Sequence, residues 1–461
     1  MTRIEANQSA AIVNDEAAAQ PPVDAPKRPS LRKRAVNATA VTMVGNATQQ
    51  GIRFVTNVLL AWVLFPEAFG LMALVNSFIH GLQLFSDVGV GASIIQRKNA
   101  EQSNFLQTAW TLQIIRGFAL WGCAALIAAP AAWIYEERSL IFLLPVAALT
   151  MAIKGFDSTA IHRLQRHLHL GKVTILEQGS HLVTVAVMVT CALVYKSVWA
   201  LVVGSLAGAA FHVIVSHFIL PDSRDRLGWD RAAARELIQF GGWIFLTAPF
   251  LYVVRHGHPL LLGLFMTTGE LGIFSFAMKL SQLSTKLLSQ LGRKVLFPLF
   301  SRVAERGVEA VRGRMFTARL LILAAGLPIP LALMLWGDRL VWMIYDDRYS
   351  DAAWMLQILA AGSLFTCFMQ TNGPLVLGLG DSFRLMVVTA ARAFCAVTGM
   401  LIGQQLAGPL GMIMAYALVD VLAYPAMAWA LDHLKVWMPK LDLGMMLLCG
   451  AVVLVKFCLL S

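Results

Sequence analysis

The sequence predicts an all-α polytopic membrane protein of two parallel six-helix bundles, with about one extra C-terminal transmembrane helix. About thirteen apolar stretches are long enough to cross a membrane. Hydrophobic residues make up 58% of the chain and charged residues 14%, too few charges to cover a water-soluble protein of 461 residues. The first two stretches also recur later in the chain, which indicates duplication.

The repeat is visible in two matching segments. Arg53 precedes an apolar run that leads into Phe69-Gly70-Leu71, and Arg255 leads in the same way into Leu271-Gly272-Ile273. The offset is the same in both places, because 255 − 53 and 272 − 70 are both 202. Six spans return a chain to the side on which it started, so the two halves run in the same direction. Arg53 and Arg255 are therefore expected at equivalent positions on the inner walls of the two halves.

The chain divides into five predicted parts. The polar segment before the first span lacks the apolar core of a signal peptide and is expected to be a disordered, basic cytoplasmic tail. The parts are the tail at 1–35, a first bundle at 36–220, a flexible cytoplasmic linker at 221–235, a second bundle at 236–430 and a peripheral C-terminal transmembrane segment at 431–461. The spans lie at about 36–64, 67–95, 105–132, 139–162, 173–195, 198–220, 236–264, 268–300, 314–337, 353–379, 384–405, 409–430 and 443–460.

Basic residues give the orientation. With the tail in the cytoplasm, the loops on the opposite side carry only Arg138, Lys196, Arg339 and Arg348, as the positive-inside rule requires. The net charge of +11 therefore reflects topology signals rather than a nucleic-acid surface. The six cysteines all fall inside apolar stretches without metal-like spacing, so free thiols are expected, with no metal and no cofactor.

Polar side chains inside the spans mark the expected site. Residues three or four apart share a helical face, and three spans carry such polar stripes. The stripes are Asn46, Gln50, Arg53 and Asn57 in the first span; Asn76, His80, Gln83 and Asp87 in the second; and Ser275, Lys279, Gln282, Lys286, Ser289 and Arg293 in the eighth. A single Asn or Gln is explained equally well as a contact between helices, and Lys286 or Arg293 as snorkelling toward headgroups.

The arginines within the spans are harder to explain in that way. An arginine in lipid costs at least about 2.5–3.5 kcal/mol, so Arg53, Arg116 and Arg255 should face a cavity or a partner. Together with Lys279 and Arg392 they predict a cationic central cavity for an anion such as phosphate, pyrophosphate or carboxylate. The expected substrate-binding residues are Arg53, Arg116, Arg255, Lys279, Arg392, Asn46, Gln50, His80, Gln83 and Gln282.

The acidic residues in the spans have two interpretations. Lys154 and Asp157 are three residues apart, and we expect them to neutralise each other. Glu177 and His181 are four apart, a spacing that permits ion-coupled proton exchange. The ion-coupling candidates are Asp87, Glu177 and His181.

Four short runs resemble a known family, the polysaccharide transporter or oligosaccharide flippase family, within a likeness that covers roughly residues 36–430. The runs are Leu64–Leu71, Leu84–Arg97, Gly269–Ser275 and Leu291–Pro298. This family shares a superfamily with the multidrug extruders and the flippase for the cell-wall lipid precursor. His256 and His258 stand where relatives often carry Asn and Asp, so the likeness supplies no coupling site in the seventh span.

The resemblance implies a V-shaped pair of six-helix bundles around a central cavity that opens alternately inward and outward. The implied substrate is a polyprenyl-pyrophosphate-linked oligosaccharide, moved across a bacterial inner membrane for exopolysaccharide, capsule or O-antigen synthesis. Implied partners are the lipid bilayer and the polymerase and chain-length or export proteins of the pathway.

Other classes fit less well. A multidrug extruder of the same superfamily is the nearest alternative, but extruders of cationic drugs need acidic cavities. A membrane glycosyl polymerase or ligase needs a large outer loop, whereas the longest outer loop here, 337–352, is short. A structural scaffold has little reason to keep arginines within its spans. The sequence has no P-loop, so we expect a transporter that is not an enzyme, driven by an ion gradient or by consumption of its product.

Overall fold

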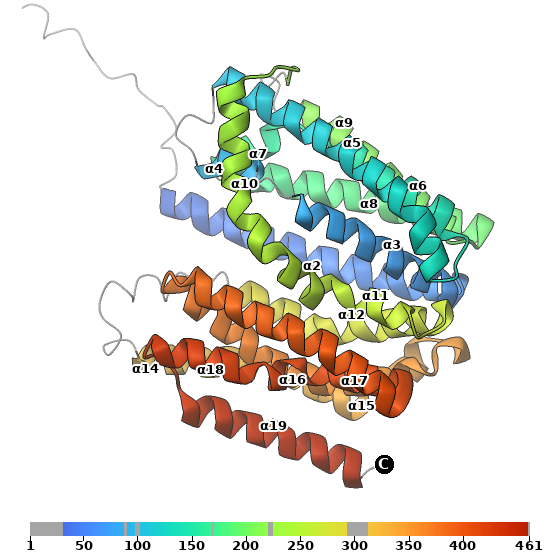
Figure 1. Ribbon diagram of the computed structural model, residues 1–461, viewed down its shortest axis with the longest axis vertical. Coiled ribbons are helices and arrows are strands. Elements are labelled where there is room, and N and C mark those ends of the chain that lie inside the picture. The colour runs from blue at the N-terminus through green and yellow to red at the C-terminus, as the bar shows by residue number, and fades with distance from the viewer. Residues whose placement is uncertain are drawn as a thin grey trace, which may run out of the picture.

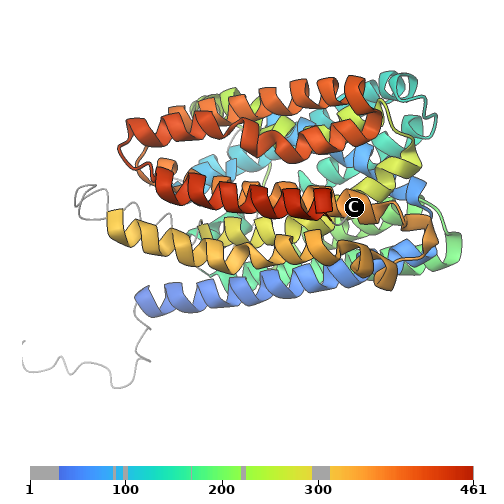
Figure 2. The same ribbon diagram turned by 90° about the horizontal axis from the view of Figure 1, so that it is seen from below.

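The computed structural model describes residues 31–86, 90–96, 102–167, 169–219, 225–292 and 312–459, and these residues form helices joined by loops, without a strand. The long helices run roughly side by side (Figure 2) and gather into two bundles, drawn one above the other in Figure 1. The first bundle holds α2 (Leu31–Val63), α3 (Pro66–Phe85), α4 (Val90–Gln96), α5 (Ser103–Ile134), α6 (Leu140–Lys154), α7 (Ala160–Arg166), α8 (Leu170–Tyr195) and α9 (Trp199–Phe218).

The chain then passes into the second bundle. It continues through α10 (Arg231–Tyr252), the π-helix η1 (Val253–Gly257), α11 (His258–Gly263), α12 (Thr268–Leu291), α14 (Arg312–Gly326), α15 (Pro328–Ile344), η4 (Asp347–Tyr349), α16 (Ala352–Gly378), α17 (Ser382–Leu422) and α18 (Tyr424–His433). The last helix, α19 (Pro439–Leu459), lies along the outside of this bundle (Figure 1). The predicted all-α, two-bundle membrane fold is confirmed.

Each predicted span coincides with one or more helices. Seven helical segments in the described part of the chain are long and apolar enough to cross a membrane. The helix α17 contains the predicted span 384–405 and the first part of span 409–430, which continues into α18. The two parts of α17 are separated by a kink, where Ala407 leaves the helical conformation and Gly408 adopts a φ of 61°. Residues 1–30 of the predicted tail lie outside the described residues. Its last five residues, from Leu31, already belong to α2.

Local sequence fixes several helix starts. The helix α12 begins with a capping box, in which the hydroxyl of Thr267 accepts from the backbone of Glu270 and the Glu270 carboxylate accepts from the backbone of Thr267. The carboxylate of Asp230 caps α10, and Pro66 opens α3 at a position where its missing N–H is harmless. These short signals set where the helices that line the site begin.

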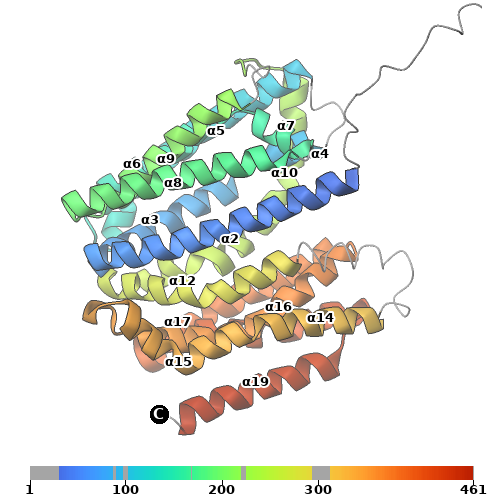
Figure 3. The same cartoon turned by 180° about the vertical axis from the view of Figure 1, so that it is seen from behind.

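The two bundles meet where α3 and α12 begin, and we call this the closed end. A Cβ on Gly70 would collide with the carbonyl of Thr268, so the two backbones touch there. The indole of Trp62 donates to the carbonyl of Ile344 at 2.8 Å, and the hydroxyl of Tyr349 donates to the carbonyl of Leu64 at 3.2 Å. The bundles spread apart toward the other end (Figures 1 and 3).

The described part of the linker is fastened to the first bundle. The hydroxyls of Ser158 and Thr159 donate to the Asp225 carboxylate at 2.6 and 2.5 Å. The backbone N–H of Asp230 donates to the hydroxyl of Thr108 at 2.9 Å. The helix α10 then packs against α3, α4 and α5 as well as α17. Side chains of the first bundle therefore hold Asp225 and Asp230, and the last residues of the predicted linker, from Arg231, already belong to α10.

The helix α19 is tied to the second bundle at its first turn. Arg319 of α14 and Asp442 of α19 form an ion pair in which both side chains are fully buried. The hydroxyl of Tyr424 donates to Asp442 at 2.9 Å, and the indole of Trp437 donates to that hydroxyl at 3.2 Å. The sequence predicted a peripheral segment here. In the structure, a charged pair shielded from lipid anchors α19 to the second bundle.

Candidate functional site

Two neighbouring cavities lie on different sides of α12. The first, of about 280 Å³, is lined by α2, α3, α8 and α9 of the first bundle and by Ser275 and Lys279 of α12. We call it the shared pocket. The second, of about 790 Å³, is lined by η1, α12, α16 and α17 with Met427 of α18, and we call it the C-terminal cavity. The helix α12 contributes side chains to both, with Lys279 in the shared pocket and Gln282 in the C-terminal cavity.

Cationic side chains from both bundles face the shared pocket. Arg53 of α2 and Lys279 of α12 line it, with Asn57, Asn76 and His181 as further polar groups. None of the described residues that line it is an Asp or Glu. The charge of Lys286, two helical turns along α12 from Lys279, repels both Arg53 and Lys279. Positive charge without a local counter-ion makes this pocket suited to an anion.

The position of Lys279 is defined by three contacts. Its ammonium donates to the amide oxygen of Asn57 at 3.2 Å. It also lies over the rings of Phe69 and Phe276, 5.6 and 5.2 Å from their centroids. Asn57 and Phe69 belong to the first bundle, so Lys279 forms a direct link between the two bundles.

The C-terminal cavity contains more hydroxyl and amide groups. Its polar lining includes Gln282 and Thr285 of α12, Thr366 and Gln370 of α16 and Thr389 of α17. Arg255 of η1 and Arg392 of α17 line it as well. The guanidinium of Arg392 donates to Asp420 at 2.7 Å, so its charge is compensated within the cavity. Lys286 lines this cavity too, so two further cations, Arg255 and Lys286, stand beside the neutralised pair. The hydroxyl and amide groups match the hydrogen-bonding capacity of a sugar.

The repeat places Arg53 and Arg255 on different cavities. Arg53 lines the shared pocket, whereas Arg255 lies on the π-helical turn η1 and lines the C-terminal cavity. Next to Arg255, the ring of His256 lies 4.5 Å from the ring of His80 on α3, which adds a second contact between the bundles. The two arginines, which the repeat relates, thus line different pockets.

Several predicted residues lie outside both cavities. The guanidinium of Arg116 donates to the carbonyl of Gln83 at 2.8 Å and to the hydroxyl of Ser86 at 3.0 Å. These two groups at the end of α3 are partners for the half-buried charge of Arg116, which the sequence left open. Gln50, His80 and Gln83 line neither cavity. The side chain of Asn46 and all of Asp87 are outside the described residues.

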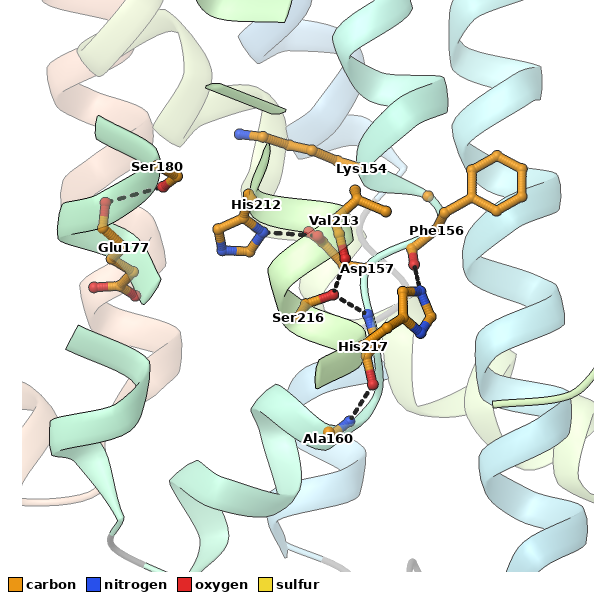
Figure 4. Close-up of polar contacts among 12 residues, drawn as sticks. Lys154, Phe156, Asp157, Ala160, Glu177, Ser180, His212, Val213, Ser216 and His217 are labelled. Atoms are coloured by element: carbon orange, nitrogen blue, oxygen red, sulfur yellow. Dashed lines mark hydrogen bonds and ion pairs between the residues drawn. The ribbon is translucent and has the colours of Figure 1, made fainter. Parts of the chain in front are cut away.

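The acidic pairs differ from the prediction. The Asp157 carboxylate lies 2.7 Å from Nδ1 of His212 on α9, whereas Lys154 points away from it (Figure 4). The predicted neutralisation by Lys154 is wrong, because Asp157 follows the end of α6 at a turn and faces α9 instead. The hydroxyl of Ser216 and the ring of His217 bind the same turn through Ser158 and Phe156.

The pair Glu177 and His181 does not form in the structure. No ion pair joins these two described side chains; Glu177 is exposed on α8, and His181 lines the shared pocket near Arg53.

Within the described residues, no cluster of three or more His, Cys, Asp or Glu side chains could hold a metal ion. Lys286 belongs to the polar stripe expected in the eighth span, where snorkelling was an alternative explanation, and it lines the C-terminal cavity.

Comparison with known proteins identifies the family to which the chain belongs. Residues 59–354 match the family described as polysaccharide biosynthesis protein. The chain belongs to this family. One relative is the lipopolysaccharide biosynthesis protein WzxC of Escherichia coli (strain K12), 21% identical over 401 residues, which are 85% of this chain and 80% of the relative. Another is the succinoglycan biosynthesis transport protein ExoT of Rhizobium meliloti (strain 1021), 21% identical over 80% of this chain and 76% of ExoT.

Solved structures show which fold this family member shares. The lipid II flippase MurJ in an inward closed conformation aligns with a TM-score of 0.72 at 11% identity, covering 90% of this chain and 92% of MurJ. An inward-facing multidrug resistance transporter of the MATE family aligns with a TM-score of 0.65 at 13% identity, covering 84% of this chain and 94% of that protein. Both alignments span most of each chain, so the three proteins share one fold.

Proposed function

We propose that this protein is a flippase that moves polyprenyl-pyrophosphate-linked oligosaccharide repeat units across the bacterial inner membrane, for synthesis of an exopolysaccharide, capsule or O-antigen. Membership of the polysaccharide biosynthesis family and the MurJ-like fold support this function. The observation that carries it is the shared pocket, where Arg53 and Lys279 come from opposite bundles and no described acidic residue lines the wall.

The two cavities divide the substrate between them. The shared pocket has the size and charge for the pyrophosphate, which Arg53 and Lys279 bind. The larger C-terminal cavity takes the sugars through Gln282, Arg255 and the Arg392–Asp420 pair. The polyprenyl tail stays in the lipid outside the bundles.

The closed end faces the periplasm in this proposal. The loops at that end are the ones that the positive-inside rule assigns outside, and the N-terminus is then cytoplasmic. Substrate enters between the spread ends of the bundles, and transport requires the closed end to open while the other end closes. The functional units are the bundles at 36–220 and 236–430, with 431–461 attached to the second.

A role as a transporter rather than an enzyme fits the names of ExoT and MurJ. The working partners are then the lipid-linked oligosaccharide and the polymerase and export proteins that consume it. Of the ion-coupling candidates, His181 lines the shared pocket and would lie close to the bound pyrophosphate. Glu177 does not line this pocket.

Reconstitution tests the function directly. The purified protein is placed in vesicles that contain a fluorescent polyprenyl-pyrophosphate oligosaccharide, and the fraction that a membrane-impermeant quencher reaches is followed with time. Flipping by the wild type and its loss in Arg53→Ala support the proposal. Absence of flipping together with efflux of a cationic dye from the same vesicles would instead establish the multidrug extruder.

A further inference from the structure

Lys279 stands between the anion site and the contact that closes the molecule. On one side its ammonium faces the shared pocket with Arg53. Toward the bundle interface it rests on Phe276 and on Phe69, which also lines that pocket; the two rings pack edge to face 4.5 Å apart across the boundary between the bundles. One side chain therefore touches both the proposed binding site and the bundle interface.

The two phenylalanines belong to an aromatic cluster that continues to the closed end. The ring of Phe276 lies 5.4 Å from that of Tyr345 and 5.0 Å from that of Tyr349. Tyr349 in turn donates to the carbonyl of Leu64 at the end of α2. The contacts form an unbroken series from the shared pocket to the hydrogen bonds that join the bundles.

We propose that Lys279 couples occupation of the shared pocket to opening of the closed end. This proposal rests on the proposed function, because the ligand that it senses is the pyrophosphate group of the substrate. In the empty pocket, Lys279 braces the closed end through Asn57, Phe69 and Phe276. An anion competes for the same ammonium, and a charge-assisted bond to phosphate is stronger than a cation–π contact. Binding therefore removes the brace and favours separation of the bundles at that end.

Arg53 provides the matched comparison. It lines the same pocket and has a similar charge, but it makes none of the contacts with Phe69 or Phe276 that Lys279 makes. A residue that only binds the anion should change affinity and leave the empty protein closed. A residue that also braces the closed end should change the empty protein as well.

The test measures the distance across the closed end with spin labels on cysteines at Arg138 and Ser350, both exposed, in a chain whose six native cysteines are replaced by alanine. The protein is held in phosphatidylcholine vesicles, and the probe is inorganic pyrophosphate. In the otherwise unchanged chain, we expect a short distance between the labels without pyrophosphate. Adding pyrophosphate should move part of the molecules to a longer distance. Lys279→Ala should raise the ratio of open to closed molecules roughly tenfold without pyrophosphate, and adding it should change little.

The control variants decide between binding and bracing. Arg53→Ala should stay closed without pyrophosphate and need more of it to open. Lys279→Arg keeps the charge and the aromatic contact, so it should respond like the unchanged chain. Phe276→Leu removes one ring and keeps the ammonium, so it should open without pyrophosphate while still binding it.

Two results would overturn the proposal. One is a Lys279→Ala variant that remains as closed as Arg53→Ala. The other is a calorimetric measurement that shows pyrophosphate binding to the unchanged chain while the spin-label distance across the closed end stays the same. Pyrophosphate that does not bind counts against the proposed function instead, and the comparison of ligand-free Lys279→Ala with Arg53→Ala then still decides whether Lys279 braces the closed end.

Discussion

Gly70 and Gly272 touch each other where α3 crosses α12, and they occupy the same place in the two halves of the chain, 202 residues apart. The contact is reciprocal. A Cβ built on Gly70 would lie 3.1 Å from the backbone nitrogen of Gly272, and a Cβ on Gly272 would lie 3.1 Å from that of Gly70. A Cβ on Gly70 would also collide with the carbonyl of Thr268, and a Cβ on Gly272 with the carbonyl of Pro66. The pseudo-symmetry of the duplicated chain therefore passes through this crossing, which only glycine permits.

Alanine at this crossing should force the closed end apart. For Gly70→Ala and Gly272→Ala we expect a loss of about 1–3 kcal/mol from the closed arrangement, because backbone atoms have no room to yield. The spin-label distance between positions 138 and 350 should lengthen in both variants. Gly51→Ala on α2 is the control, since a Cβ there meets nothing within 4 Å. Unchanged distances in both crossing variants would show that the helices slide without separating.

Arg53 should matter for binding more than for folding. Arg53→Ala removes a charge-assisted contact to pyrophosphate, worth about 1.5–3 kcal/mol, so the affinity should fall by a factor of ten or more. Arg53→Lys keeps the charge but loses the two-pronged geometry, so polymer export should be rescued only in part. Export is measured beside the amount of protein in the membrane. Normal export by Arg53→Ala at normal abundance would remove support for the anion site.

Arg116 should show the opposite behaviour. Its bonds to the Gln83 carbonyl and the Ser86 hydroxyl hold the end of α3, so Arg116→Ala should lower the free energy of unfolding by about 1–3 kcal/mol. Thermal unfolding in detergent measures this loss. Flipping per folded molecule should stay close to that of the wild type. A large loss of flipping without a loss of thermal stability would place Arg116 in the substrate path after all.

The buried pair Arg319 and Asp442 should behave as a unit. Asp442→Leu leaves a fully buried guanidinium without its carboxylate, and we expect about 3–5 kcal/mol of destabilisation. Replacing both residues, as Arg319→Met with Asp442→Leu, should restore most of it, because no buried charge remains. Thermal unfolding of the single and double variants gives the comparison. A double variant as unstable as the single one would mean that the pair holds α19 by its geometry rather than by charge balance.

The sequence by itself determined the class of the protein, the positions of its spans and the repeat. A backbone in lipid must satisfy its own hydrogen bonds, so each crossing is a helix whose length and apolar character are local properties of the chain. The same local periodicity placed Arg53 and Lys279 on polar faces, and the structure finds both in the shared pocket.

Only the tertiary structure decided which polar groups meet. Asp157 pairs with His212, 55 positions away, instead of Lys154, and Arg116 holds the end of α3 instead of facing a cavity. Which residues of α12 line each cavity depends on how this helix is rotated against α3, which it touches at Gly70 and Gly272. Helical spacing fixes which residues share a face. The direction of that face is set by packing between distant segments, which no local pattern records.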